Sequence, residues 1–157
     1  MSTDLFELAH ASDLFEEAQA AFAEYCREPS SRLLLFVLFS LNHLREWIAE
    51  ASYKELEKKR KNGSALLPNE EFYLEIEQLE EFRTIRELCN RSKHHSVKFG
   101  GGCTSVTHGL TVDGNCNDSL GQVYYRIDGV DSRRVFLPVF LAYYQWFAAH
   151  QVAGATR

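Results

Sequence analysis

Two short segments of the chain combine apolar surroundings with side chains that can do chemistry. They are residues 41–47 (LNHLREW) and residues 86–95 (RELCNRSKHH). Asn90 and His94 are four residues apart, so they share one face of a helix, and Arg86 extends that face by one turn. Histidine passes protons near neutral pH, and clustered cations can hold phosphate. The second segment therefore predicts a polar site near the end of a helix.

The first segment places His43 in the most apolar helix of the chain. If this helix packs antiparallel to the one that carries Asn90, His43 can approach His94, although the packing does not require it. The same residues have structural interpretations. His43 can form a satisfied core pair with Glu46, Asn90 can cap its helix, and His94 can complement the helix dipole.

Residues 90–94 (NRSKH) resemble one half of the R-N-x-x-x-H motif of HEPN domains. HEPN domains are small helical bundles, often dimeric, that include RNA-cutting toxins and defence proteins. The resemblance implies cleavage of RNA without a metal, with the motif's arginine and histidine at a dimer interface. The motif's arginine position is Cys89 in this chain, and a thiol cannot supply a guanidinium to a phosphate. Arg86 and Arg91 are the substitutes that the segment offers.

The resemblance implies a role for each residue of the cluster. His94 would be the general acid and base, and Asn90 would orient it or the substrate. Arg86, Arg91 and Lys93 would hold phosphate, with His43 as a further substrate contact. The alternative function is a non-catalytic helical interaction module, a degenerate relative that dimerises or binds a protein partner. A looser resemblance, to uncharacterised bacterial helical proteins, implies no activity.

The charge of the chain argues against a general coat for nucleic acid, because the net charge is −5. Residues 54–61 nevertheless carry five bases against two acids, which leaves room for local phosphate binding. The first residues show no basic or apolar leader, and the longest apolar run, residues 33–39, is far shorter than the roughly 20 residues of a membrane span. We expect a soluble, cytoplasmic protein with no membrane contact.

The four cysteines show no C-x-x-C spacing, and without an export signal free thiols are expected. Cys103, His108 and Cys116 offer three ligands at irregular spacing in a glycine-rich stretch. We therefore expect no metal site and no cofactor.

The apolar periodicity predicts one mainly α domain over residues 1–157, a four-helix up-down bundle with a small antiparallel β insert before the last helix. The insert is expected at about residues 97–130, with strands at 104–112 and 122–127. The expected helices are listed by residue number: 3–27, 31–61, 68–94 and 135–152. Pro138 is expected in the first turn of the last helix, where proline is tolerated.

Residues 33–39 are apolar almost all round, and such a helix is either central in its fold or part of a subunit interface. Because the chain is small, we predict that this segment forms a homodimer interface.

Overall fold

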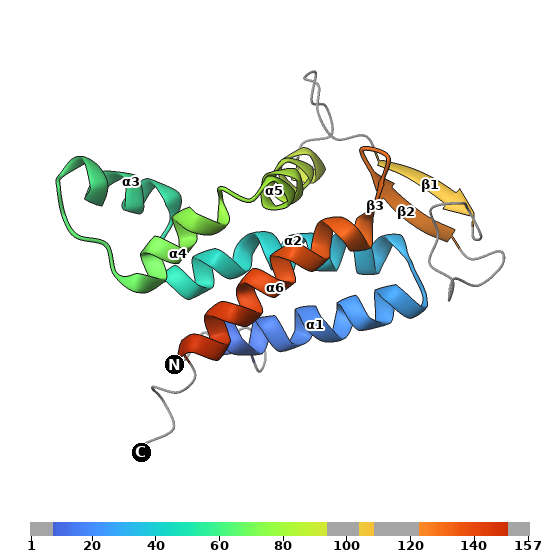
Figure 1. Ribbon diagram of the computed structural model, residues 1–157, viewed down its shortest axis with the longest axis horizontal. Helices are drawn as coiled ribbons and strands as arrows, with labels where there is room; N and C mark the ends of the chain where they lie inside the picture. Colours follow the sequence, from blue (N-terminus) through green and yellow to red (C-terminus); the bar gives the residue numbers. More distant parts are fainter. Residues whose placement is uncertain (1–7, 94–103, 109–122, 151–157) are drawn as a thin grey trace, which may run out of the picture.

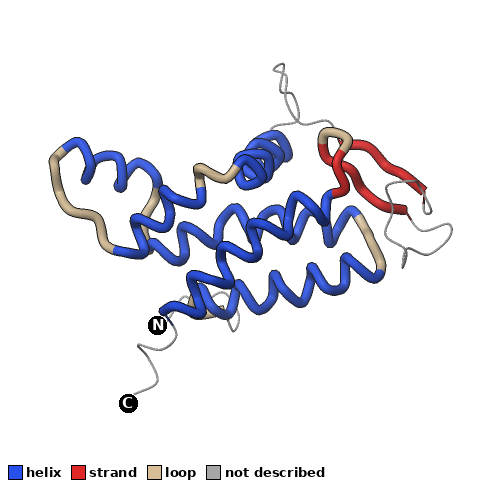
Figure 2. The backbone as a smooth tube through the Cα atoms, in the orientation of Figure 1, coloured by secondary structure: helices blue, strands red, loops and turns tan. Residues whose placement is uncertain are grey.

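The computed structural model describes residues 8–93, 104–108 and 123–150. These ranges hold six helices and three strands, which confirms a mainly helical chain with a small antiparallel sheet before its last helix (Figures 1 and 2). The elements are α1 (Ala11–Arg27), α2 (Ser31–Ala49), α3 (Tyr53–Lys61), α4 (Pro68–Ile76), α5 (Glu80–Lys93), β1 (Thr104–His108), β2 (Val123–Ile127), β3 (Val130–Asp131) and α6 (Ser132–His150).

The helix α2 occupies the middle of the fold and contacts α1, α4 and α5. The last helix, α6, crosses in front of it and contacts α1, α4 and α5 in turn (Figure 1). The four buried positions Leu33, Leu34, Val37 and Leu38 show that most of the apolar run lies in the chain's own core, while residues 35 and 36 remain about half exposed. Among the described residues, no helix has the length and apolarity needed to cross a bilayer.

A single helix over residues 31–61 is a wrong prediction, because α2 ends at Ala49. Glu50 adopts a left-handed conformation, with φ 50° and ψ 28°. The amide of Asn69, from α4, donates to the carbonyl oxygens of Ile48 and Ala49 at 3.1 and 3.4 Å. Ser52 then starts α3, since its backbone N–H and its hydroxyl both donate to Glu55 Oε2 at 2.7 Å. The break is therefore stabilised by a residue distant in sequence.

A single helix over residues 68–94 is also wrong, because α4 ends at Ile76 and α5 begins at Glu80. Glu77 closes α4, and its carboxylate binds the buried guanidinium of Arg45 on α2. The first turn of α4 is held by Glu70, whose Oε2 accepts the N–H of Leu67 at 2.9 Å. The bend between α4 and α5 thus coincides with an ion pair to the central helix.

The first helix begins at Ala11, later than the predicted residue 3, and residues 1–7 lie outside the described part. Asp13 fixes this start, because its Oδ2 accepts the backbone N–H groups of Ala9 and His10 at 2.9 and 2.8 Å. These bonds hold the pKa of Asp13 below its ordinary value. A carboxylate in the first turn also suits the positive end of the helix dipole.

The last helix begins at Ser132, three residues before the predicted start, so Pro138 lies inside it and not in its first turn. Asp131 caps the helix, since its Oδ1 accepts the N–H of Arg133 at 2.9 Å. Proline has no N–H, so the carbonyl of Arg134 loses its usual partner within the helix.

The sheet has the order β1-β2-β3, and both pairs are antiparallel. Ile127 pairs with Val130 across a two-residue turn, in which Asp128 and Gly129 have φ values of 50° and 78°. Positive φ at both residues is the geometry of a type I′ hairpin turn, which Asp-Gly favours. The predicted strand at 104–112 is observed as Thr104–His108, and residues 109–112 are not described.

Candidate functional site

Position 89, where the HEPN motif has arginine, points into the core. Cys89 is 1% exposed, and its Sγ donates a hydrogen bond to the carbonyl oxygen of Leu38 on α2 at 3.3 Å. Because α5 packs on α2 along this face, position 89 supplies packing between the two helices. A phosphate outside the protein could not be reached from here.

Two of the other predicted site residues, Arg86 and Asn90, lie on the outward side of α5. Asn90 is exposed, and Arg86, one turn earlier, has about a third of its side chain exposed. The structure therefore brings Arg86 and Asn90 onto one outward surface, as the spacing predicts. Arg91 is partly buried, and Lys93 ends the helix with a side chain outside the described part. His94 also lies outside the described residues.

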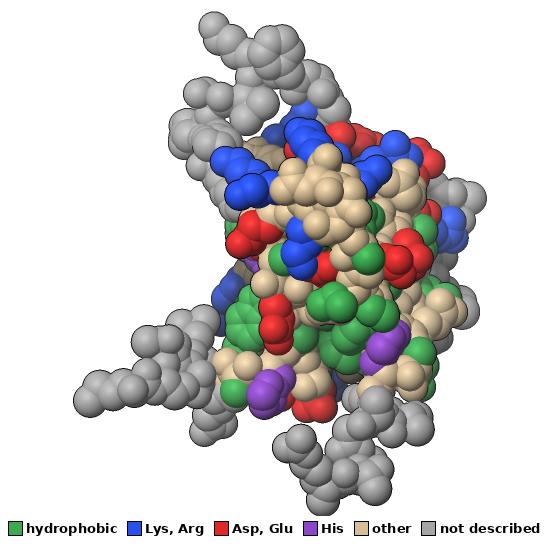
Figure 3. Space-filling model, turned by 90° about the vertical axis from the view of Figure 1, so that its left-hand side faces the viewer, with side chains coloured by type: hydrophobic (Ala, Val, Ile, Leu, Met, Phe, Trp, Pro, Cys, Tyr) green, Lys and Arg blue, Asp and Glu red, His purple; other side chains and the backbone are tan. Residues whose placement is uncertain are grey.

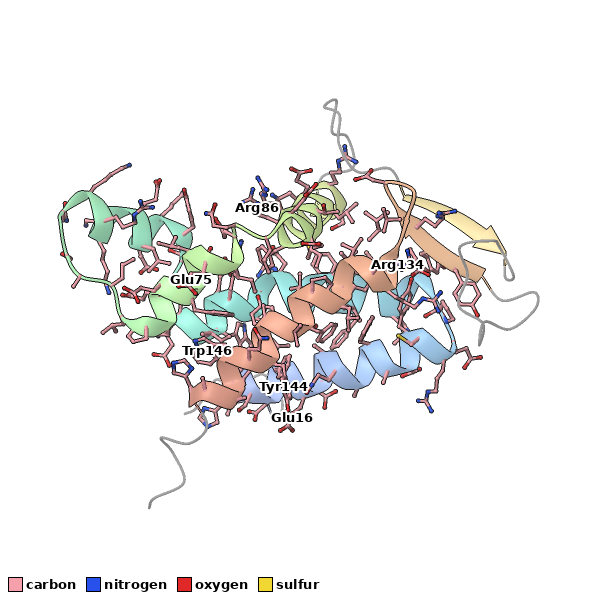
Figure 4. All side chains as sticks on the ribbon, in the orientation of Figure 1. Glu16, Glu75, Arg86, Arg134, Tyr144 and Trp146 are labelled. Carbon is pink, nitrogen blue, oxygen red and sulfur yellow. The ribbon has the colours of Figure 1, made fainter. Side chains whose placement is uncertain are left out.

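Arg86 is held in place by a carboxylate that the sequence did not single out. The Nη1 atom of Arg86 lies 3.4 Å from Oε1 of Glu77, at the bend between α4 and α5. The same Oε1 binds Nη1 of Arg45, whose side chain is buried in the core. Glu77 thus joins a buried guanidinium to one at the surface, and Figure 4 shows Arg86 on the edge of the molecule away from α1.

Two aromatic rings enclose the buried guanidinium. The Cζ atom of Arg45 lies 4.7 Å from the ring centre of Tyr73 and 4.8 Å from that of Phe82. These are cation–π distances in a desolvated site, where the attraction is strongest. Arg45 could have been found in the sequence, because Leu41, Arg45 and Ile48 share the helical spacing of a buried face.

The interior of this network is buried, since Tyr73 is fully buried and Arg45 nearly so. Burial raises the pKa of Tyr73 to about 12, against the opposing charge of Arg45, and the negative charge of Glu77 adds to the rise. Within the described part of the chain, Tyr73 Oη and Arg45 Nε have no hydrogen-bond partner. Tyr73 therefore stays protonated near neutral pH, and the positive charge of Arg45 depends on Glu77 and the two rings for its stabilisation.

His43 does not join the face of α5. Its Nδ1 lies 3.2 Å from Oε2 of Glu46, and the two side chains are 36% and 40% exposed. The pair is therefore at the surface and not in the core. Among the described contacts, no hydrogen bond or ion pair connects His43 with Arg86 or Asn90, and its predicted approach to His94 falls outside the described residues.

The short helix α3 adds a basic surface beside this edge. The last four residues of α3, Lys58–Lys61, are all cations. Lys59 pairs with the buried Glu70, and Lys61 pairs with Glu57 at 3.6 Å. Figure 3, which views the molecule from this end, shows Lys and Arg side chains gathered at the top, over α3. Predicted phosphate binding by residues 54–61 thus has an exposed surface available.

The expected absence of metal is not tested on the ligands that the sequence offers. Cys103 and Cys116 lie outside the described residues, and the side chain of His108 is not described. In the ranges that are described, no group of His, Cys, Asp and Glu could hold a metal ion. In the described part of the chain, Cys26 and Cys89 do not form a disulfide, and burial raises the pKa of Cys26 above its ordinary value.

The surface is hollowed on both sides of α6. One hollow, of about 360 Å³, lies against α4 and contains Phe72, Glu75 and Trp146. Another, of about 150 Å³, lies against α1 and contains Glu16 and Tyr144. Both are separate from the face of α5 that carries Arg86 and Asn90.

Comparison of the chain with known protein families, with curated proteins and with solved structures finds no match.

Proposed function

We propose that this chain is an RNA-binding protein of HEPN-like type, which contacts the RNA backbone through the outer face of α5. The observation that carries the proposal is the placement of Arg86, which is exposed to solvent on one side and bound to Glu77 on the other. A guanidinium held by a carboxylate loses less side-chain freedom when it binds a phosphate. Its remaining N–H groups stay available to the ligand.

The surroundings of Arg86 support an anionic ligand of extended shape. Asn90 lies one turn further along the same face and can donate or accept hydrogen bonds with a ribose or a base. The cations of α3 lie along the same edge of the molecule (Figures 3 and 4). Such a basic edge on an acidic protein directs a polyanion to one side.

The catalytic form of this proposal assigns proton transfer to His94, with Asn90 as the residue that orients it. The ribose 2′-hydroxyl would attack the adjacent phosphate, and His94 would take the proton and return it to the leaving oxygen. Arg86, Arg91 and Lys93 would stabilise the charge on the phosphate, and no metal is needed.

The proposal also takes α1, α2, α5 and α6 as the four principal helices of an up-down bundle.

Binding can be tested by fluorescence anisotropy with a labelled single-stranded RNA at low salt. Arg86→Ala is expected to weaken binding at least about tenfold, because a charged hydrogen bond to phosphate is worth roughly 1.5–3 kcal/mol. Arg32→Ala is the matched control, since Arg32 is an exposed arginine on α2, a different helix. Equal losses for the two variants would mean that only total charge matters, and the proposed site would be wrong.

Cleavage can be tested on the same RNA in the presence of EDTA. His94→Ala is expected to abolish cleavage with little change in the melting temperature, because a general acid–base contributes about 100- to 10,000-fold in rate. His95→Ala, one residue further, is the matched control and should retain activity. Cleavage that survives in His94→Ala, or that requires a metal, would contradict the catalytic form.

The second candidate function is a non-catalytic interaction module, and the position of Cys89 favours it. A residue in the core cannot take the part of the motif's arginine in a reaction. If the wild-type protein neither binds nor cuts RNA, the exposed apolar surfaces of the chain become its main functional feature.

A further inference from the structure

The outer face of α6 carries an apolar stripe that its own chain does not cover. Leu137, Leu141 and Tyr144 follow one another at helical spacing, and they are 60%, 53% and 57% exposed. The opposite face of α6 is buried in the core through Phe136, Phe140 and other apolar residues. A surface helix of a monomer would normally carry polar side chains where this stripe lies.

The C-terminal half of the stripe has a hollow on each side. The hollow against α4 measures about 360 Å³ and includes Trp146, whose Nε1 has no hydrogen-bond partner among the described residues. The smaller hollow against α1, of about 150 Å³, includes Tyr144 and Phe147. Both hollows border the C-terminal half of α6, where they leave room for side chains of a partner that packs on the stripe.

The charges along the stripe have opposite signs at its two ends. Arg134 is exposed at the N-terminal end of α6. Glu16 and Glu75 are exposed near the other end, where Glu16 lines the hollow with Tyr144 and Glu75 lines the hollow with Trp146. Figure 4 shows Arg134 at one end of α6 and the two carboxylates near the opposite end. Within the described part, none of the three forms an ion pair.

We propose that this surface binds a second copy of the chain, with the two α6 helices antiparallel about a two-fold axis near Leu141. In that arrangement the apolar stripes cover each other, and Arg134 of each protomer lies over the end of the other α6 that Glu16 and Glu75 flank, one on each side. A two-fold interface requires a surface that is complementary to itself. An apolar stripe with a cation at one end and carboxylates at the other meets this requirement, whereas a partner of different sequence would have no need of it.

The proposal differs from the interface expected on α2 and does not depend on RNA binding. Residues 33–39 are mostly buried within the chain, and Leu35 and Phe36 are each 42% exposed. The α6 stripe is longer and more exposed than this pair. These two surfaces therefore give matched variants, in which one exposed leucine on each helix is replaced by glutamate.

The first test is the mass of the full-length protein in solution, measured by sedimentation velocity over micromolar concentrations. The wild type is expected at twice the chain mass of 18.0 kDa. Leu141→Glu is expected at the mass of one chain, with an unchanged circular dichroism spectrum because the residue is exposed. Leu35→Glu is expected to remain a dimer. A wild type that stays monomeric, or a dimer lost in Leu35→Glu and kept in Leu141→Glu, would overturn the proposal.

The second test uses two charge-reversed proteins, Arg134→Glu and the double variant Glu16→Arg with Glu75→Arg. Each alone places like charges together and is expected to dimerise at least about tenfold more weakly than wild type at low salt. Mixed together, they restore both sets of opposite charges and are expected to form a heterodimer. Two variants that stay monomeric when mixed would contradict the antiparallel arrangement.

Discussion

At the scale of single residues, the carboxylate of Glu77 connects the core to the proposed binding surface. It binds the buried guanidinium of Arg45 and the partly exposed guanidinium of Arg86 through the same oxygen. The two arginines should therefore respond very differently to mutation. Arg45 is expected to stabilise the fold, and Arg86 is part of the proposed binding surface.

Replacement of Arg45 by alanine is expected to lower the free energy of unfolding by about 3–5 kcal/mol, because it leaves the carboxylate of Glu77 without its buried partner. Arg86→Ala is expected to cost less than about 1 kcal/mol, since its ion pair is partly exposed. Urea unfolding followed by circular dichroism measures both. Equal losses of unfolding free energy in the two variants would show that the buried ion pair stabilises the fold no more than the exposed one.

Glu77 is proposed as a positioning residue for Arg86. Glu77→Gln removes a negative charge, so charge alone would strengthen RNA binding, whereas loss of the positioned guanidinium should weaken it several-fold. In an Arg86→Ala background the same change should have no further weakening effect, because there is nothing left to position. Anisotropy titrations of the four proteins, at a temperature where all are folded, complete this double-mutant cycle. Stronger binding by Glu77→Gln would exclude the positioning role.

At the scale of elements, three helices begin with a carboxylate in the same role. Asp13, Glu55 and Glu70 each accept backbone N–H groups at the start of α1, α3 and α4. These hydrogen bonds come first among the causes that hold the pKa of each carboxyl below its ordinary value, and for Glu70 the charge of Lys59 helps as well.

The lowered pKa values predict how stability depends on pH. A carboxyl group with a lower pKa in the folded state stabilises the protein above its ordinary pKa, and this stabilisation is lost as the pH falls through the folded-state pKa. The melting temperature is therefore expected to fall once the pH drops below about 4.5, the ordinary range of glutamate. Glu55→Gln and Glu70→Gln should flatten this fall. Glu80→Gln is the control, because Glu80 is an exposed glutamate in the first turn of another helix, α5.

Local signals in the sequence predict several boundaries correctly. Ser30 caps α2 by accepting the N–H of Leu33 at 3.3 Å, and Asp128-Gly129 forms the tight turn of the hairpin. The breaks after Ala49 and Ile76 could not be predicted in the same way. Each depends on a partner far along the chain, since Asn69 caps the end of α2 and Arg45 binds Glu77 at the end of α4.

In the candidate site, too, local relations could be predicted from the sequence and long-range contacts could not. Helical spacing correctly places Arg86 and Asn90 on one face of α5, because that relation is local. It could not show that Cys89 faces α2, which depends on how α5 packs. It also missed Glu77, whose role depends on a bend that the apolar pattern does not reveal.

At the scale of the whole molecule, the two proposed surfaces lie on different elements. The RNA surface is on α5 and the edge near α3, and the dimer surface is on α6 between α1 and α4. A protein can therefore use both at once, and a two-fold dimer would carry two RNA surfaces. Two linked sites bind one long RNA more tightly than either does alone. The monomeric Leu141→Glu variant should accordingly lose affinity for long RNA while it retains that for a short oligonucleotide.

The most direct test of RNA binding is an NMR titration of isotope-labelled protein with a short single-stranded oligoribonucleotide. The largest chemical-shift changes are expected on α5, at Arg86 and Asn90, with smaller changes on α3 and none along the α6 stripe. Added salt should reverse these changes, because the proposed contacts are to phosphate. Changes absent at saturating RNA, or confined to α6 and the hollows beside it, would contradict the assignment of α5 as an RNA-binding surface.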